Sequence, residues 1–194
     1  EVTGESIEKF MITKGNNFSL DTLPLTGMGE EAAGFIHQNK NQELTITVPK
    51  GSKVADPVFI NYKLNKDNPS LLEEINILAE EDSEATIVVT YEGEECDNLL
   101  HGSLFYMKAG KNAVIRPIQV QLLPDTAFHF NNIGALTDQS SQIHITQCEL
   151  GSAQGITGIM GELRGNDSEF YVDTIYFGDK DRSLDINYVA NHYG

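Results

Sequence analysis

The sequence predicts an all-β protein that winds as a parallel β-helix, or β-solenoid. Three observations carry this prediction. Apolar segments rich in β-branched residues recur from Leu44 to the end of the chain, their starting points lie 13 to 15 residues apart, and clusters of Gly, Asn, Asp and Ser separate them. Such clusters favour turns, and a constant spacing is typical of stacked units of similar length. Two segments would make roughly one coil.

Eleven segments follow this pattern and are expected to be strands. Each has the length and the apolar content of a strand with one buried face. In chain order they are LTITV (44–48), VFINYKL (58–64), LEEINIL (72–78), TIVVTYE (86–92), HGSLFYM (101–107), VIRPIQVQLL (114–123), AFHFNNI (127–133), SQIHITQCEL (141–150), ITGIMGEL (156–163), EFYVDTIYF (169–177) and SLDINYV (183–189).

The regular spacing favours a solenoid over a β-sandwich, because sandwiches combine strands of varied length with a few long connections. Turn clusters such as PKGS (49–52) and KAGKN (108–112) supply the corners. The glycines of ELGSAQGITGIMGELRG (149–165) are interpreted as corner residues, since glycine adopts backbone angles that other residues resist. Residues 1–43 lack the pattern. We expect them to form a partly irregular or helical N-terminal segment with a helix over Glu5–Lys14, and residues 44–194 to form the β-helical core.

The charge balance limits the partners. The chain carries 29 Asp and Glu against 13 Lys and Arg, a formal net charge of −16. Nucleic acids and anionic membranes bind positive charge, so neither is an expected partner. Two interpretations agree with this charge. The acidic residues form an ordinary solvated surface, or they attract cations or a basic partner. No apolar run is long enough to span a membrane and no disulfide framework is present, so we expect a cytoplasmic protein with reduced thiols.

Candidate chemistry is sparse. His144, Thr146 and Cys148 alternate along IHITQC and should share one face of a strand, where Cys148 and His144 could hold iron or receive sulfur. The alternative is that Cys148 is an inert, buried thiol. No Cys/His cluster has the spacing of a metal site, and no nucleophile or phosphate-binding motif occurs. We therefore predict that the chain is not an enzyme.

Two weaker patterns complete the candidates. The histidines are scattered among the segments, and coiling could bring together those of HFNNI, IHITQC and VANHY. Paired carboxylates, such as Glu73 with Glu74, are expected to be solvated.

An ordered series of motifs resembles the SufB/SufD family of iron–sulfur cluster assembly proteins (SUF system). The motifs are TVPKGSKVADPV (47–58), EINILAEEDSEATIVVTYEGEE (74–95), LLHGSLFYMKAGKNA (99–113), IQVQLLPDTAFHF (118–130) and SSQIHITQCELGSAQGITGIMGELRGNDSEFYVDTIYF (140–177). The last contains segments similar to the family's Gly-Ser-Ala stretch and its Leu-Arg-Gly turn. Their order along the chain carries the resemblance, because no one of them is specific alone.

The resemblance implies a right-handed parallel β-helix that acts as a scaffold subunit in complex with a SufC-type ABC ATPase. It also implies a SufB/SufD paralogue or a second copy as partner. An iron–sulfur cluster would belong to the full-length complex, with none bound to this chain alone.

The resemblance also bears on individual residues. Gly161 stands where SufB-type members carry a cysteine before the Leu-Arg-Gly turn, which favours a SufD-like or divergent short member. The family's remaining cluster-related residues lie in a C-terminal region that would follow Gly194. We thus expect the core to be truncated at its C-terminal end, with an open edge that self-associates.

Two other function classes remain open. One is a β-solenoid interaction module without metal chemistry, which would use its acidic faces to bind a basic partner. The other is a carbohydrate-active β-helix enzyme, which the absence of tryptophan and the location of the carboxylates in turns disfavour.

Overall fold

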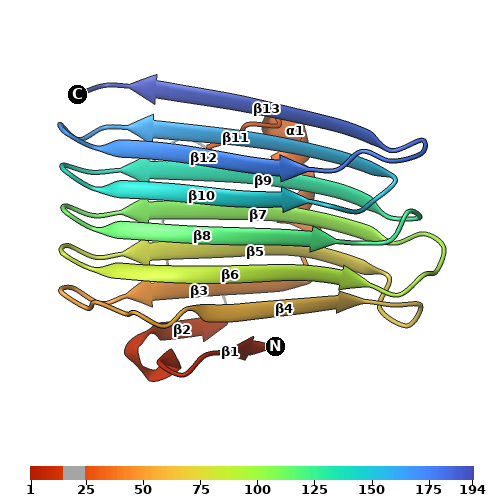
Figure 1. The fold of residues 1–194 in the computed structure, drawn as a ribbon, viewed down its shortest axis with the longest axis horizontal. Coiled ribbons are helices and arrows are strands. Elements are labelled where there is room, and N and C mark those ends of the chain that lie inside the picture. Colours follow the sequence, from red (N-terminus) through yellow and green to blue (C-terminus); the bar gives the residue numbers. More distant parts are fainter. Residues whose placement is uncertain (15–24) are drawn as a thin grey trace.

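The computed structural model describes residues 1–14 and 25–194, and its core is a parallel β-solenoid of about five turns (Figure 1). The predicted parallel β-helix is thus confirmed. Successive strands alternate between two sheets that run along the solenoid axis. Sheet A consists of β1 (Val2–Thr3), β4 (Val58–Leu64), β6 (Glu84–Gly93), β8 (Val114–Leu122), β10 (Gln142–Glu149) and β12 (Glu169–Tyr176). Sheet B consists of β13 (Ser183–His192), β11 (Gln154–Leu163), β9 (Phe128–Thr137), β7 (Leu100–Ala109), β5 (Ser70–Ala79), β3 (Gln42–Val48) and β2 (Met11–Lys14).

Each of the eleven predicted segments lies on one of the strands β3 to β13. Strands of consecutive coils pair in parallel, so residues about 30 positions apart stack directly above one another. Leu71, His101 and His129 form one such ladder. Ladders, rather than local neighbours, therefore decide which side chains meet inside the solenoid.

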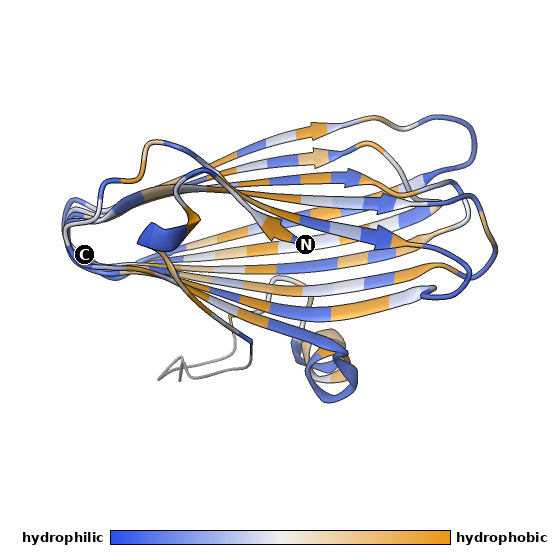
Figure 2. Ribbon diagram, turned by 90° about the horizontal axis from the view of Figure 1, so that it is seen from below, coloured by the Kyte–Doolittle hydropathy of each residue, from blue (hydrophilic) through white to orange (hydrophobic). Residues whose placement is uncertain are grey.

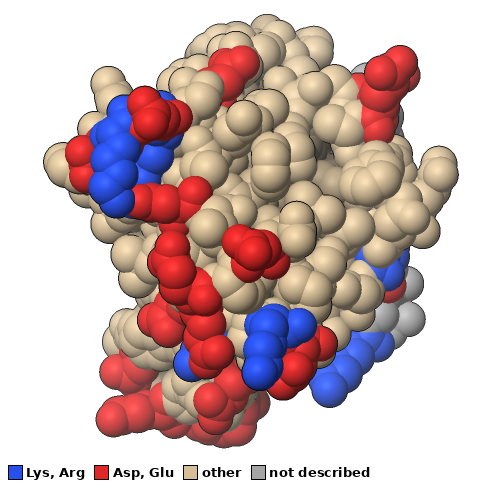
Figure 3. All heavy atoms as spheres, turned by 90° about the vertical axis from the view of Figure 1, so that its right-hand side faces the viewer, with Lys and Arg blue, Asp and Glu red and all other residues tan. Residues whose placement is uncertain are grey.

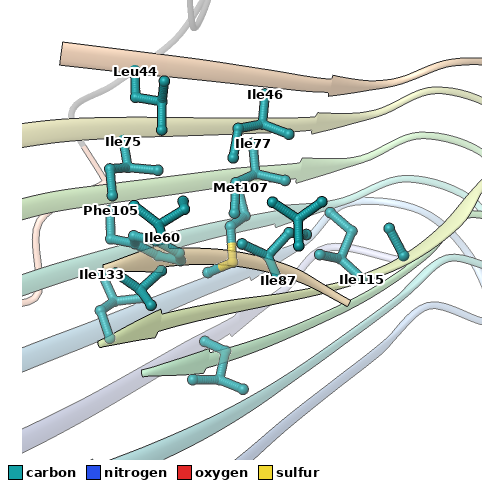
Figure 4. Packing of buried hydrophobic residues seen from close by; sticks show 14 of the residues in the cluster. Leu44, Ile46, Ile60, Ile75, Ile77, Ile87, Phe105, Met107, Ile115 and Ile133 are labelled. Carbon is teal, nitrogen blue, oxygen red and sulfur yellow. The ribbon is translucent and has the colours of Figure 1, made fainter. Parts of the chain in front are cut away.

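One half of the interior is apolar. Ladders of Leu44, Ile75, Phe105, Ile133 and Ile159 from sheet B face Ile87, Ile115 and Ile143 from sheet A (Figure 4). Burying a side chain of this size stabilises the fold by about 1.5–3 kcal/mol. The stack of branched chains therefore supplies the main stabilisation of every coil.

The corners are built differently from the prediction. Left-handed backbone angles occur at Asp82, Asn112, Ser140 and Asp167, whereas no glycine between 149 and 165 has a positive φ. These turns also stack, because the amides of Asp82 and Asn112 donate to carbonyls of the next coil. Asp, Asn and Ser tolerate the left-handed region through local side-chain hydrogen bonds. Gly151 and Gly165 do lie at corners, whereas Gly155, Gly158 and Gly161 lie within β11, and none of the five adopts a left-handed backbone. The interpretation that corner backbone angles explain these glycines is therefore wrong.

Those glycines instead permit close contacts. A Cβ atom at Gly151 would lie 2.0 Å from the carbonyl oxygen of Leu123, and one at Gly165 would lie 2.0 Å from the amide nitrogen of Gln139. Backbone of adjacent coils occupies these positions, so a side chain has no room.

The N-terminal segment also departs from the prediction. Residues 5–14 contain a short 3₁₀ turn, Ile7–Lys9, followed by strand β2, so the predicted helix over Glu5–Lys14 is wrong. An α-helix, α1 (Glu30–Asn39), lies instead on the outer face of sheet B. Ala33 and Ile36 pack there in a second apolar cluster that includes Leu72, Leu104, Tyr106 and Leu136. No helix in the described parts of the chain is long and apolar enough to cross a membrane.

Candidate functional site

The other half of the solenoid interior is polar, and we call it the polar column. It begins where strands of sheet A end and strands of sheet B begin, on the side where the two sheets spread apart (Figure 2). Large polar side chains replace the aliphatic ladders there over several coils. The column comprises Tyr62, Glu73, Tyr91, His101, Ser103, Gln119, Gln121, His129, Asn131, Gln147, Glu149 and Thr157.

At its centre two histidines meet. The Nδ1 atoms of His101 and His129 lie 2.7 Å apart, the distance of a hydrogen bond, and both side chains are fully buried. The ring planes are only 14° apart. Since an imidazole nitrogen either donates or accepts, one of the two Nδ1 atoms must carry the bridging hydrogen.

A carboxylate lies at each outer side of this pair. Glu73 Oε1 is 3.5 Å from Nε2 of His101, and Glu149 Oε1 is 3.3 Å from Nε2 of His129. The result is a continuous chain of four ionisable groups across three coils.

Two tyrosines surround the Glu73 end. The Tyr91 hydroxyl donates to Glu73 Oε1 at 2.5 Å, and the Tyr91 ring stacks on Tyr62 with centroids 5.8 Å apart. Burial and the nearby Glu73 carboxylate raise the pKa of both tyrosines well above the ordinary value. Both hydroxyls therefore remain protonated and can donate to Glu73.

Three side chains surround the Glu149 end. Glu149 Oε1 accepts from Gln147 Nε2 at 2.6 Å and from the Thr157 hydroxyl at 3.2 Å, beside His129. Burial opposes ionisation, but the attraction of His129 and these hydrogen bonds outweigh it and lower the pKa of Glu149. Glu149 is thus a buried, ionised carboxylate.

The polar column is incompletely satisfied. No Lys or Arg side chain is buried anywhere in the described residues, so no fixed positive charge offsets the carboxylates. Buried polar atoms usually have hydrogen-bond partners, and each exception calls for a ligand or an ordered water. Eight column atoms have none: Glu73 Oε2, His101 Nε2, Ser103 Oγ, Gln119 Nε2, Gln121 Nε2, Asn131 Oδ1, Gln147 Oε1 and Glu149 Oε2.

The lower end of the column borders on solvent. A cavity of about 320 Å³ opens between the first coils, and Tyr62 and Leu71 line it together with Asn41, Asn61 and Ser70. Tyr62 is half-buried and lies between this cavity and Tyr91. Small polar species can therefore approach the column at Tyr62.

Comparison with known proteins identifies the fold family. The sequence model of a protein family, the SufBD core domain of SUF system FeS cluster assembly, matches residues 62–194. The chain belongs to the SufBD family. The resemblance seen in the sequence is thus confirmed, and the family supports a role in SUF iron–sulfur cluster assembly. No curated protein matches the chain.

Within this SufBD core, Cys148 and His144 share the outward face of β10, as the alternation predicts. His144 Nε2 bonds Asp173 Oδ2 at 2.6 Å, whereas Cys148 lies between Val120 and Ile175 of the neighbouring strands. Four residues of strand separate the two side chains by about 13 Å. Cys148 is half-buried, and burial together with the Glu149 charge raises the pKa of its thiol. The structure does not bring His144 and Cys148 together, and their role as a cofactor site stays a prediction.

Gly161, for which the resemblance implies a thiol in SufB-type members, lies on the inward face of β11. A Cβ atom there would lie 2.5 Å from the Phe170 ring. Phe170, on β12, occupies the space that a side chain at this position would need.

The polar column itself was missed from the sequence. Glu73 and Glu74 were expected in solvent, but both are buried on opposite faces of β5, Glu73 inside the solenoid and Glu74 beneath α1. The expected grouping of His129 with His144 and His192 is also wrong, since His129 pairs with His101. The available signal was the 28-residue interval between His101 and His129, which is one coil.

Proposed function

We propose that this chain is a scaffold subunit of the SUF machinery and works with a SufC-type ABC ATPase. The observation that carries the proposal is the match of the SufBD core to residues 62–194. The partner and the scaffold role are what membership of this family implies.

The architecture suits such a role. Parallel ladders join every coil to its neighbours, and the apolar half of the interior is continuous from β3 to β11. A solenoid of this kind behaves as a stiff rod, because each coil is fixed by the coils on both sides. A nucleotide-driven movement of a bound ATPase would therefore move the whole subunit as one body.

Cys148 is the residue we assign to sulfur handling in this scaffold, with His144 as a second group on the same face. Its thiol is partly accessible, and its neighbours Val120 and Ile175 leave it on a largely apolar outer surface. A thiol with a raised pKa is mostly protonated at neutral pH and reacts slowly. Cluster assembly at this position would thus depend on a partner that lowers the pKa of the thiol.

A second candidate function is a β-solenoid interaction module without metal chemistry. Figure 3, which looks at the side of the solenoid where the strands of sheet A end, supports this candidate: Asp and Glu side chains form a stripe along one edge, with a few Lys and Arg side chains next to them. Together with the net charge of −16, such a surface would attract a basic partner.

Anaerobic co-purification separates the two functions. The tagged protein is expressed with its chromosomal neighbours, bound proteins are identified, and iron and acid-labile sulfide are assayed. The scaffold proposal expects an ABC-type ATPase together with labile sulfide, and expects Cys148→Ser to reduce the sulfide while the ATPase still binds. Recovery of a basic partner without ATPase, iron or sulfide would instead support the interaction module.

A further inference from the structure

We propose that Glu73 and His101 form a buried binding site for a divalent cation inside the solenoid, with the Tyr91 and Ser103 hydroxyls as further oxygen donors. The proposal concerns the polar column and does not depend on the scaffold function, since it predicts an ion held by the chain alone.

The first argument is charge. The side chains of Glu73 and Glu149 are only 0% and 2% exposed. No Lys or Arg side chain is buried in the described residues. Buried carboxylates need a paired cation, a metal ion or protonation. One divalent ion would offset both negative charges.

The second argument is the position of the hydrogens. Ionised Glu149 can only accept, so Nε2 of His129 carries the hydrogen of their 3.3 Å contact. An ion at His101 requires that Nδ1 of His129 accepts, so that the hydrogen of the 2.7 Å bridge belongs to Nδ1 of His101. Nε2 of His101 is left with a free lone pair, fully buried and without a hydrogen-bond partner.

The third argument is distance. The free lone pair of His101 faces Glu73 Oε1 at 3.5 Å. Two ligands of one tetrahedral ion, each about 2.1 Å from it, lie about 3.4 Å apart. Two lone pairs at this separation repel each other unless a hydrogen on Nε2 or a cation lies between them. A separation of 3.5 Å is long for a hydrogen bond, and it fits an ion bound by both atoms.

Further oxygen atoms that could bind the ion lie close to Glu73. Glu73 Oε2 has no partner, the Tyr91 hydroxyl is 2.5 Å from Oε1, and Ser103 stacks directly next to Glu73 on the same inward ladder. No three His, Cys, Asp or Glu side chains of the described residues converge on one point, so hydroxyl oxygens or water would complete the shell. Imidazole, carboxylate and hydroxyl ligands suit Zn²⁺, Mn²⁺ or Fe²⁺.

His129 and Glu149 would act as outer-shell groups. A histidine that binds a metal usually donates its other ring hydrogen to an acceptor, which fixes its orientation and raises its basicity. Here Nδ1 of His101 donates to His129, which donates to Glu149. The chain of hydrogen bonds thus holds the free nitrogen of His101 toward Glu73. Ions would enter from the cavity at Tyr62.

The test is metal titration of the full chain after removal of metal with EDTA. We expect one equivalent of Zn²⁺ to bind per chain by calorimetry, Co²⁺ to give a visible absorption that Zn²⁺ displaces, and the thermal midpoint to rise with added Zn²⁺. Glu73→Gln and His101→Gln should abolish binding, and His129→Gln should weaken it by about 10–100-fold. The matched control His144→Gln removes a surface imidazole and should leave one equivalent bound.

Three results would overturn the site. They are an absence of stoichiometric ion binding by the stripped wild-type chain, an unchanged affinity in His101→Gln, or ¹⁵N spectra of the metal-free chain in which Nε2 of His101 carries hydrogen. The last result would mean that a proton occupies the position. If the variants fail to fold, the wild-type spectra decide alone, because Zn²⁺ must shift Nε2 of His101 and leave His144 unchanged.

Discussion

The imidazoles of His101 and His129 share one hydrogen bond between their Nδ1 atoms, 2.7 Å long, although 28 residues separate them in the sequence. One coil of the solenoid accounts for this interval, because His101 and His129 are direct partners in the parallel register of β7 and β9. The pair lies between two carboxylates in the polar half of the described interior, so removing either ring takes a buried partner from the carboxylate beside it.

The first prediction concerns this pair. His129→Leu should lower the free energy of unfolding by about 3 kcal/mol, because breaking a buried charged network leaves Glu149 and His101 without their partner. Urea denaturation measures the change. His144→Leu is the control, since its bond to Asp173 lies on the surface and should be worth less than about 1 kcal/mol. Equal losses in the two variants would contradict the structural importance of the pair.

A second prediction concerns the segment that crosses sheet B before α1. A Cβ atom at Gly158 would lie 2.2 Å from the carbonyl carbon of Gly27, so Gly158→Ala must push this segment away from the sheet. We expect a loss of about 1–3 kcal/mol in unfolding free energy, with faster hydrogen exchange at the Met28 amide, which donates to Asn132 Oδ1.

Gly34→Ala is the control for that variant. Gly34 lies in α1, and a Cβ atom there meets nothing within 4 Å. Alanine should therefore stabilise the helix by about 0.5–1 kcal/mol. A Gly158→Ala chain as stable as wild type would mean that the segment does not lie against β11.

A third prediction is acid release of α1. Glu74 lies beneath the helix and binds Lys40 Nζ at 2.7 Å and His37 Nδ1 at 2.8 Å. Burial opposes ionisation, but these hydrogen bonds outweigh it and lower the pKa of Glu74 below its unfolded value of 4.5. The stabilisation is therefore complete above pH 4.5 and is lost as the pH falls through the lower folded-state pKa.

The free energy of unfolding, measured between pH 3 and 7, tests whether stability falls as the pH is lowered. The wild-type chain should lose stability below about pH 4.5, and Glu74→Gln should flatten part of that dependence. Glu94→Gln, which removes an exposed partner of Lys63, should leave the curve unchanged. A flat wild-type curve would show that Glu74 contributes nothing that depends on its charge.

The fold was predictable because its signal is local and repeated. The alternation in TIVVTYE directly identifies Ile87, Val89 and Tyr91 as the inward-facing residues of one strand. A similar alternation returns in the other coils. Helix α1 was not predictable in this way, because its stability comes from packing of Ala33 and Ile36 on sheet B rather than from a strong pattern of its own.

The polar column escaped prediction for the opposite reason. Glu73 and Glu74 are adjacent in the sequence but point to opposite faces of β5, and only the exact register of neighbouring coils determines that Glu73 meets His101 and Tyr91. Acidic residues next to each other are usually solvated, so the composition indicated the surface. Gly161 could be located by motif. The ring that leaves no room for a side chain there, Phe170, lies on another strand and could not be identified from the motif.

A final prediction concerns Cys148. Burial and the neighbouring Glu149 charge raise the pKa of its thiol, and only the thiolate reacts with alkylating reagents. Iodoacetamide should therefore modify Cys148 more slowly at pH 7.5 in the folded chain than in urea, with a rate that keeps rising above pH 9. Mass spectrometry of the modified peptides separates Cys148 from Cys96, and Cys148→Ser removes the slow phase. Faster alkylation in the folded state than in urea would reverse the interpretation, because it would mean that the isolated chain already activates this thiol for sulfur transfer without a partner.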